Sequence, residues 1–282
     1  MTAYLNKTFD LNEHELVELF DEVNLWGAPF GLLLLDTVRY RKHITALDIG
    51  FGAGFPLTEL AMRLGSTSKV YGIDPWERAT QRAERKLGLY GIQNVEIIRG
   101  VAENIPLPDA HLDLIVSNNG INNVQDLPKA LSECARTLKP GGQFVQSINL
   151  NTTMHEFYDA MEQALRELEL PEAVENMRAQ IYKMRKPLEE MTGLLEAHGF
   201  KVLSVLHDSF SYKFADGSAL LNHYFMQLGF MGGWKSVLDE AQQAPVFERI
   251  EAILNERAQA NGLVQLTVPF VVIDCERVSS PT

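Results

Sequence analysis

Short apolar runs alternate with amphipathic stretches through the first half of this chain. The runs cover 44–50, 69–74, 95–99, 112–117 and 143–148. Between them, apolar residues recur at helical spacing over 56–64, 77–89 and 127–138. Strands that alternate with helices in this way form βαβ units, in which helices cover both faces of a parallel sheet. The pattern therefore predicts an α/β protein.

The alternation changes after residue 150. Helical periodicity fills 151–198 and 218–260, with further strands predicted at 200–206 and 263–275. The last strand has no crossover helix of its own, so we expect it to be antiparallel. The simplest architecture is a doubly wound, mostly parallel sheet of seven strands with helical insertions that form a cap. Two further helices, over 11–23 and 30–40, are predicted before the first strand.

A glycine-rich loop, Asp48-Ile-Gly-Phe-Gly-Ala-Gly-Phe55, directly follows the first strand. Glycines at alternate positions let a turn adopt positive φ and bring bare backbone against a ligand. The dinucleotide fingerprint G-x-G-x-x-G requires glycine where this chain has Phe55, and a phosphate-binding P-loop requires a Lys that is missing. Asp48 would repel a phosphate. The loop therefore favours a ligand that carries a positive charge.

Asp74 ends the second predicted strand, 20 residues after Gly54. At the carboxyl edge of a parallel sheet, a carboxylate in this position can accept hydrogen bonds from two ribose hydroxyls. Dinucleotide-dependent enzymes use the same arrangement, so Asp74 alone does not identify the ligand.

Three more segments complete a recognisable set: Arg99-Gly-Val-Ala-Glu-Asn-Ile-Pro-Leu-Pro108, Leu112-Asp-Leu-Ile-Val-Ser-Asn-Asn119 and Leu138-Lys-Pro-Gly-Gly142. Together with the glycine loop and Asp74, they resemble class I S-adenosylmethionine-dependent methyltransferases. The nearest group contains the quinone-biosynthesis C-methyltransferases and many small-molecule methyltransferases. The resemblance covers residues 44–150 and implies a Rossmann-like methyltransferase fold. S-adenosylmethionine would be the cofactor, and S-adenosylhomocysteine the product.

The resemblance also implies roles for residues at matching positions. Asp48 would lie near the amino group of the cofactor, and Asn118 would close the methionine end. Gly50, Gly52 and Gly54 would hold the methionine part, and Asp74 the ribose. Around the adenine would lie Pro75, Trp76, Ala102 and Glu103. This family commonly has an acidic residue where this chain has Val101, so either Glu103 replaces it or backbone groups hold the adenine.

The sequence indicates the catalytic and acceptor-binding residues less clearly than the cofactor-binding residues. No side chain is an evident general base, and the candidates are His14, His223 and Tyr212. We expect a small, partly apolar acceptor, because aromatic residues gather before the glycine loop and in the predicted cap. The predicted acceptor residues are Trp26, Phe30, Phe55, Asn119, Tyr212, Phe214 and Phe225. No metal-binding motif is present.

Domain boundaries follow from these assignments. We expect a helical lid over 1–43 and the S-adenosylmethionine-binding core over 44–150. The rest of the sheet would lie in 151–282, with cap insertions at 151–198 and 212–262. No linker rich in Ser, Gly or Pro divides the chain, so the sequence predicts a single compact domain.

Composition limits the partners. The chain has 282 residues and a formal net charge of −12, which argues against a nucleic-acid partner. Only two cysteines occur and no apolar run is long enough to span a membrane, so a cytoplasmic protein is expected. Homodimerisation stays open. The alternatives are a nicotinamide-dependent oxidoreductase and a non-catalytic protein that retains the methyltransferase fold and binds the cofactor.

Overall fold

The computed structural model describes residues 3–6, 8, 10–14, 17 and 25–278. The chain divides into two compact units, where the sequence predicted one compact domain. The sheet unit comprises residues 10–149, 187–208 and 270–282, and the helical unit comprises residues 1–9, 150–186 and 209–269. Most of the helix predicted over 11–23, and with it much of the predicted lid, lies outside the described residues.

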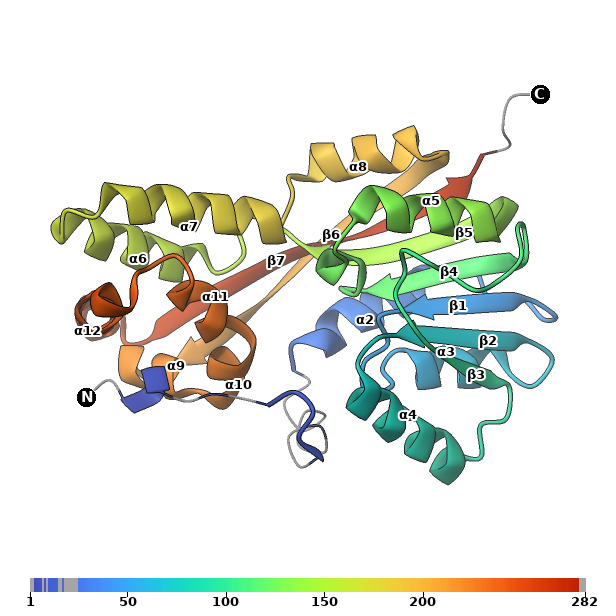
Figure 1. Cartoon of the computed structure of the whole chain (residues 1–282), viewed down its shortest axis with the longest axis horizontal. Coiled ribbons are helices and arrows are strands. Elements are labelled where there is room, and N and C mark those ends of the chain that lie inside the picture. Colours follow the sequence, from blue (N-terminus) through green and yellow to red (C-terminus); the bar gives the residue numbers. More distant parts are fainter. Residues whose placement is uncertain (1–2, 7, 9, 15–16, 18–24, 279–282) are drawn as a thin grey trace. The chain divides into compact units, whose positions relative to one another are not determined.

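A seven-stranded sheet has the order β3-β2-β1-β4-β5-β7-β6 (Figure 1). Its strands are β1 (Thr45–Ile49), β2 (Lys69–Asp74), β3 (Val95–Arg99), β4 (Leu112–Asn118), β5 (Leu138–Asn149), β6 (Phe200–Phe214) and β7 (Val264–Arg277). The pairs β3–β2, β2–β1, β1–β4 and β4–β5 are parallel, and β5–β7 is antiparallel. The predicted seven-stranded, mostly parallel sheet is therefore confirmed, and so is the antiparallel last strand.

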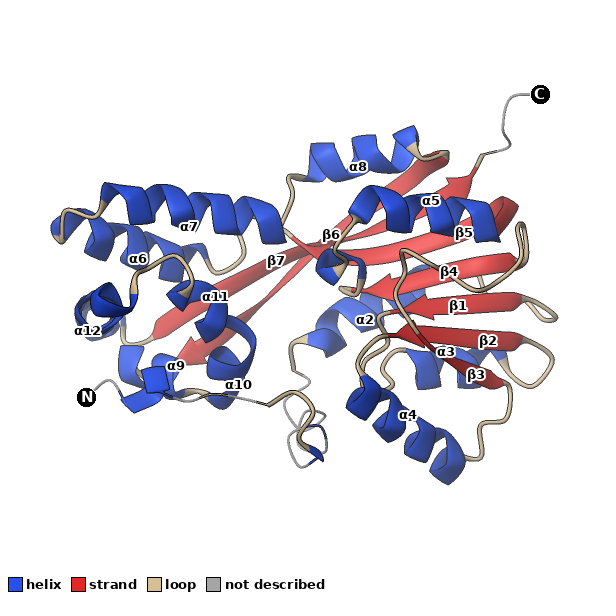
Figure 2. Cartoon of the chain, viewed as in Figure 1, coloured by secondary structure: helices blue, strands red, loops and turns tan. Residues whose placement is uncertain are grey.

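Helices cover both faces of the sheet in the sheet unit. They are α2 (Gly27–Thr37), α3 (Leu57–Leu64), α4 (Glu77–Tyr90), η3 (Ile121–Asn123), α5 (Leu127–Thr137) and α8 (Leu188–Ala197). Helices α3 and α4 lie on one side of the sheet, and α5 and α8 lie on the other (Figures 1 and 2). Apolar side chains of the central strands are buried because helices cover both faces of the sheet. Leu47, Ile115 and Phe144 are completely buried.

The helical unit contains η1 (Ala3–Asn6), α6 (His155–Glu167), α7 (Pro171–Met184), α9 (Gly217–Asn222), α10 (Tyr224–Met226), η4 (Gln227–Met231), α11 (Gly232–Lys235) and α12 (Glu240–Asn261). Of these, η4 is a π-helix. Pro171 begins α7, where its missing N–H leaves no hydrogen bond unmade. Asp239 caps α12 with a capping box, which fixes where this long helix begins.

The sixth strand corrects one prediction. The sequence indicated a strand that ends at Leu206, but β6 continues to Phe214. Phe210, Tyr212 and Phe214 alternate with the exposed Ser211 and Lys213, which is the period of a strand. Tyr212 and Phe214 therefore lie on β6, although the cap insertion was predicted from residue 212, and the helices predicted from residue 218 begin at Gly217.

Candidate active site

The glycine loop leaves β1 with three residues in backbone conformations that favour glycine. The φ angles of Gly50, Gly52 and Gly54 are 75°, 53° and 116°. The Gly50 N–H donates to the carbonyl oxygen of Ile73 at 2.9 Å, which ties the loop to β2. A Cβ atom built on Gly52 would meet no heavy atom of the described residues within 4 Å. The backbone at Gly52 therefore faces open space.

A second loop, after β4, packs directly against the first. A Cβ atom on Gly120 would lie 2.2 Å from the carbonyl oxygen of Ile49 and 2.9 Å from the Cα of Gly50. Ser117 reinforces the contact, because its Oγ donates to the Ile49 carbonyl and accepts from the Ile121 N–H, both at 3.0 Å. Gly120 and Ser117 were not among the site residues predicted from the sequence. Their positions at the end of a central parallel strand were the available signal.

The Asp74 side chain links the glycine loop to the segment that follows β2. Its Oδ2 accepts a hydrogen bond from the Gly52 N–H, and its Oδ1 accepts one from the Trp76 N–H, each at 2.8 Å. Burial raises the pKa of the Asp74 carboxyl, and the two backbone donors oppose that rise. Each oxygen retains a lone pair, so the carboxylate can still accept from ribose hydroxyls.

Asp48 is the most unusual group in the sheet unit. Its side chain is completely buried, and neither carboxylate oxygen has a hydrogen-bond partner among the described residues. Burial raises its pKa well above the ordinary value of 3.8, and the neighbouring Asp74 carboxylate raises it further. A buried carboxyl without donors is costly, so a group that supplies positive charge nearby would stabilise its ionised form.

These features fit S-adenosylmethionine. The cofactor carries a sulfonium and an ammonium group, which a buried carboxylate pair favours electrostatically. The open backbone of Gly52 permits close approach, and Asp74 can hold the ribose. The predicted sites at Asp48, Asp74 and the three glycines therefore come together at the carboxyl edge of β1 and β2.

The predicted adenine residues lie along the same edge. Trp76 Nε1 donates to the Leu11 carbonyl oxygen at 2.6 Å, and Pro75 is exposed beside it. Glu103 Oε1 accepts from the backbone N–H groups of Gln125 and Asp126, at 2.7 and 3.1 Å. Glu103 thus caps the segment before α5, which leaves its other oxygen for an adenine amine. Ala102 is buried, and Val101 is exposed.

Asn118 and Asn119 end β4 in different ways. Asn118 Nδ2 donates to the Gly27 carbonyl at 3.0 Å, and its Oδ1 accepts from Ser147 Oγ at 2.8 Å. Asn118 therefore links α2 to the sheet. Asn119 has a φ of 58°, and its buried Nδ2 lacks a hydrogen-bond acceptor among the described residues. Backbone strain with an unsatisfied donor is common at ligand sites.

Three of the predicted acceptor residues pack around α2. Phe30 is completely buried, with its ring centroid 4.5 Å from that of Phe270 and 5.4 Å from that of Trp26. The Phe55 ring lies so close to Gly31 that a Cβ there would approach it to 2.2 Å. Phe30 is thus a core residue, and Phe55 and Trp26 are partly exposed beside it.

The remaining candidates are His14, Tyr212, Phe214, His223 and Phe225. His14 is exposed, with Nε2 3.4 Å from Arg85 Nη2. Tyr212, Phe214, His223 and Phe225 belong to the helical unit. There the ring centroid of His223 lies 6.1 Å from that of Tyr212 and 5.4 Å from that of Phe214, and the Tyr212–Phe225 separation is 6.4 Å. Burial raises the pKa of Tyr212 to about 12 and lowers the pKa of His223.

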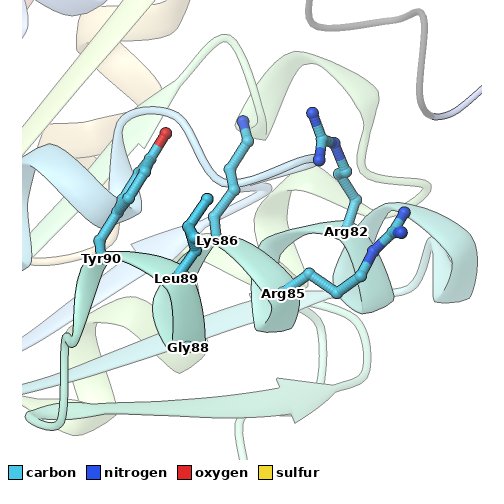
Figure 3. A pocket seen from close by; sticks show the side chains of 6 residues that line it. All are labelled: Arg82, Arg85, Lys86, Gly88, Leu89 and Tyr90. Carbon is cyan, nitrogen blue, oxygen red and sulfur yellow. The ribbon is translucent and has the colours of Figure 1, made fainter.

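A separate hollow lies on α4. It is lined by Arg82, Arg85, Lys86, Gly88, Leu89 and Tyr90, whose side chains project from one helix (Figure 3). None of the predicted site residues lines it. Over the residues that the structure describes, no His, Cys, Asp or Glu cluster could hold a metal ion, and no helix is long and apolar enough to cross a membrane.

Known proteins share this domain. Residues 47–146 match the family described as methyltransferase domain. The demethylmenaquinone methyltransferase of Geobacillus sp. strain WCH70 is 37% identical over 108 residues, which cover 38% of this chain and 46% of that protein. That of Staphylococcus aureus strain MRSA252 is 36% identical over 126 residues, which cover 45% of this chain and 50% of that protein. The chain thus spans about half the length of the curated relatives it matches.

A solved structure extends the likeness of fold beyond this domain. The YcgJ protein from Bacillus subtilis has a TM-score of 0.58 and 17% identity, over 90% of this chain and 99% of that one. Identity this low shows the fold alone. The domain match and the shared fold confirm the resemblance and the expected cofactor, S-adenosylmethionine. Residues 47–146 therefore form a methyltransferase domain of the class I S-adenosylmethionine-dependent type.

Proposed function

We propose that the protein transfers a methyl group from S-adenosylmethionine to a small, partly apolar acceptor. The observation that carries the proposal is the open backbone at Gly52 beside the buried carboxyl groups of Asp48 and Asp74. This arrangement suits a cationic nucleoside and is unsuited to a pyrophosphate. The net charge of −12 likewise favours a small acceptor over a nucleic acid.

The protein's contribution to the reaction is positioning. S-adenosylmethionine, when bound, supplies an activated methyl group that passes to the acceptor by in-line displacement. Asp74 would orient the ribose, Asp48 would balance the positive charge, and Asn118 would close the methionine end. Alignment of two reactants in a dry site can contribute roughly 7–11 kcal/mol in the most favourable intramolecular models.

A general base is needed only where the acceptor must lose a proton. His223 and Tyr212 stay candidates for that role, as does His14. The relatives' name, demethylmenaquinone methyltransferase, gives demethylmenaquinone as the acceptor for those proteins. Their similarity is confined to less than half of this chain, so we propose only that the acceptor here is small and partly apolar.

The test is a transfer assay with methyl-labelled S-adenosylmethionine and a panel of small phenols, quinols and amines. We expect label to appear in at least one acceptor and S-adenosylhomocysteine to accumulate in equal amount. The assay compares Asn118→Ala with the matched control Asn123→Ala. Asn123 is an exposed asparagine of η3, the short helix that follows β4. Loss of transfer only in Asn118→Ala supports the proposed role.

Thermal melts and the transfer assay distinguish the methyltransferase from two alternative functions. Thermal stabilisation by NAD, with none by S-adenosylhomocysteine, would indicate an oxidoreductase. Tight binding of S-adenosylmethionine without labelled product from any acceptor would indicate a non-catalytic protein of the same fold.

A further inference from the structure

The loop between β3 and β4 contains no helix or strand over residues 100–111. Long irregular loops in compact proteins usually have a function, such as binding. The backbone polar groups of such a loop need partners from other elements, and its Pro106 and Pro108 have no N–H to donate. The contacts that hold this loop therefore determine where Ala102 and Glu103, two of the predicted adenine residues, lie.

Two charged side chains of α5 bind the backbone of this loop. Glu133 Oε2 accepts from the Ile105 N–H at 2.9 Å, and Arg136 Nη2 donates to the Ile105 carbonyl oxygen at 2.8 Å. Arg136 Nη1 donates to the Leu107 carbonyl oxygen at 2.8 Å and to Asp109 Oδ1 at 2.7 Å. The contact with Asp109 is peripheral, because ion pairs with an exposed side chain contribute little. Both backbone polar groups of Ile105 are thus bound by one ion pair.

Glu133 and Arg136 also fix each other's orientation. Arg136 Nε donates to Glu133 Oε1, and Arg136 Nη2 donates to Glu133 Oε2, both at 2.8 Å. A guanidinium and a carboxylate joined by two hydrogen bonds have a well-defined relative geometry. Glu133 is buried, and the hydrogen bonds from the Arg136 guanidinium hold the pKa of its carboxyl below the ordinary value of 4.5. The pair is therefore charged at neutral pH.

Stability alone is a weak reason for this pair. When an ion pair is buried, the cost of desolvation offsets most of the attraction between the charges. An arginine supplies direction as well as charge, because its planar fork donates along fixed lines. Here those lines lead to the carbonyl oxygens of Ile105 and Leu107. The geometry therefore suits a group that fixes the path of the loop.

Glu103 attaches the same loop to the beginning of α5. Its Oε1 already accepts from the N–H groups of Gln125 and Asp126, so only the other oxygen is left for an adenine amine. The direction of that oxygen depends on where the backbone of Glu103 lies. Ile105, which is 1% exposed and is held by the ion pair, follows only two residues later. The pair therefore controls the direction of the Glu103 carboxylate through a short stretch of backbone.

We propose that Arg136 and Glu133 are positioning residues that determine the selectivity of the cofactor site for adenine. They hold Ile105, and through it they place the free oxygen of Glu103 where the adenine amine is expected. They act through the loop and not by contact with the cofactor. This inference rests on the proposed function, because it takes the carboxyl edge of the sheet as the binding site of S-adenosylmethionine.

The Arg136→Lys variant tests the geometry of the fork while the charge is retained. A lysine can still pair with Glu133, so the variant leaves no buried carboxylate unpaired. A single ammonium group cannot, however, bind the Ile105 and Leu107 carbonyl oxygens in the directions of a guanidinium. We therefore expect Arg136→Lys to fold and to hold the loop less precisely.

The matched control is Arg277→Lys. Arg277 is also partly buried, and its Nε donates to the Ala135 carbonyl oxygen of α5 at 2.8 Å. Its Nη1 donates to the Gly199 carbonyl oxygen at 3.3 Å. Both acceptors lie outside the loop. The same exchange of arginine for lysine is thus made against α5 without a change to the hydrogen bonds that hold residues 105–107.

Selectivity is measured by calorimetry with S-adenosylhomocysteine and with S-inosylhomocysteine, in which a carbonyl oxygen replaces the adenine amine. We expect the unaltered protein and Arg277→Lys to prefer S-adenosylhomocysteine to the same extent. Arg136→Lys should lose about tenfold of this preference, because a displaced carboxylate no longer distinguishes the amine from the carbonyl. A loss of folding stability alone would lower the melting temperature and leave the preference unchanged. Equal preferences in all three proteins would overturn the proposal.

Glu133→Gln changes the pair from its other side. The amide oxygen of glutamine can still accept from the Ile105 N–H, but the charge that orients Arg136 is lost. We expect the preference for S-adenosylhomocysteine to fall severalfold in this variant. An unchanged preference would contradict the role of the ion pair.

A double-mutant cycle tests whether Arg136 acts through Glu103. Glu103→Gln keeps an oxygen for the backbone N–H groups at the beginning of α5 and presents an NH₂ group to the adenine amine. This variant alone should lose most of the preference, and Arg136→Lys added to it should change the preference less than twofold. An unchanged preference in Glu103→Gln, or a further tenfold loss in the double variant, would contradict the proposal.

The same titrations distinguish this inference from the proposed function. If the unaltered protein binds neither ligand, the proposed function fails, and this inference fails with it. If the unaltered protein binds S-adenosylhomocysteine and Arg136→Lys shows the same preference, this inference alone fails and the proposed function stands.

Discussion

Asp48 has the least favourable surroundings expected for a carboxyl group. Its carboxyl is fully buried without a donor among the described residues, a placement that destabilises the ionised form. Functional sites often retain such groups because binding requires them. We propose that the Asp48 carboxylate is stabilised when the cationic cofactor binds.

Substitution of Asp48 by Asn should therefore have opposite effects on stability and binding. At neutral pH the Asp48→Asn protein should melt a few degrees higher, because it no longer buries an ionisable carboxyl. Its affinity for S-adenosylmethionine should fall about tenfold or more, which corresponds to roughly 1.4 kcal/mol. Thermal melts and calorimetry measure the two effects. A lower melting temperature with unchanged affinity would contradict this account of Asp48.

Raised carboxyl pKa values also predict how stability depends on pH. The pKa of Asp48 in the folded chain lies well above 3.8, its ordinary value, so the unfolded chain releases this proton first as pH rises. Stability should therefore fall as pH increases from about 4 through the folded pKa, a fall that Asp48→Asn reduces. Denaturant titrations at a series of pH values check this prediction.

Cofactor binding should be linked to the same proton. A cationic ligand favours the ionised carboxyl groups, so S-adenosylmethionine should bind more tightly as pH rises, and its binding should release protons. Calorimetry in buffers of different ionisation enthalpy measures the number released. Proton uptake, or affinity that falls with rising pH, would contradict the charge assignment.

At the scale of elements, two loops form the site by close backbone contact. The glycine loop after β1 and the loop after β4 meet at Gly50 and Gly120. Side chains cannot occupy this contact, so the loops after the neighbouring strands β1 and β4 approach each other as bare backbone. The contact determines where the open face at Gly52 lies.

Two glycine substitutions should separate packing from binding. Gly120→Ala would force a Cβ against the Ile49 carbonyl and should destabilise the protein by roughly 1–3 kcal/mol, as overpacking does. The Cβ of Gly52→Ala would meet no described atom, so this variant should lose only the roughly 1–2 kcal/mol of folding stability that a side chain at positive φ costs. Its methyl group would nevertheless occupy the space that we assign to the cofactor. Melting curves and calorimetry distinguish them. Unimpaired cofactor binding by Gly52→Ala would place the cofactor elsewhere.

Elements whose apolar residues follow one clear spacing along the chain could be predicted from the sequence. Strands β1 to β4 and helices α3, α4 and α5 follow the predicted ranges closely, since buried parallel strands read as apolar runs. The second half of β6 was missed because Tyr212 and Phe214 were grouped with the aromatic residues that follow. The π-helix leaves no periodic signal, since its register differs from that of the helices around it.

At the scale of the whole molecule, the sequence predicts the function of the sheet unit more fully than that of the helical unit. The match to known methyltransferases covers residues 47–146, which lie within the sheet unit. That Asp48, Asp74 and the three glycines lie together was predictable, because neighbouring parallel strands end at the same edge of the sheet. The contacts of Ser117 and Gly120 were not, because they join segments that are distant in the sequence.

The central claim is that the carboxyl edge of β1 and β2 binds S-adenosylmethionine. Calorimetric titration of S-adenosylmethionine into the unaltered protein and into Asp74→Ala tests it most directly, with Asp109→Ala, an exposed carboxylate of the sheet unit, as control. We predict binding to the unaltered and control proteins and at least tenfold weaker binding, about 1.4 kcal/mol, to Asp74→Ala. Equal affinity in all three proteins would contradict the assignment of the site.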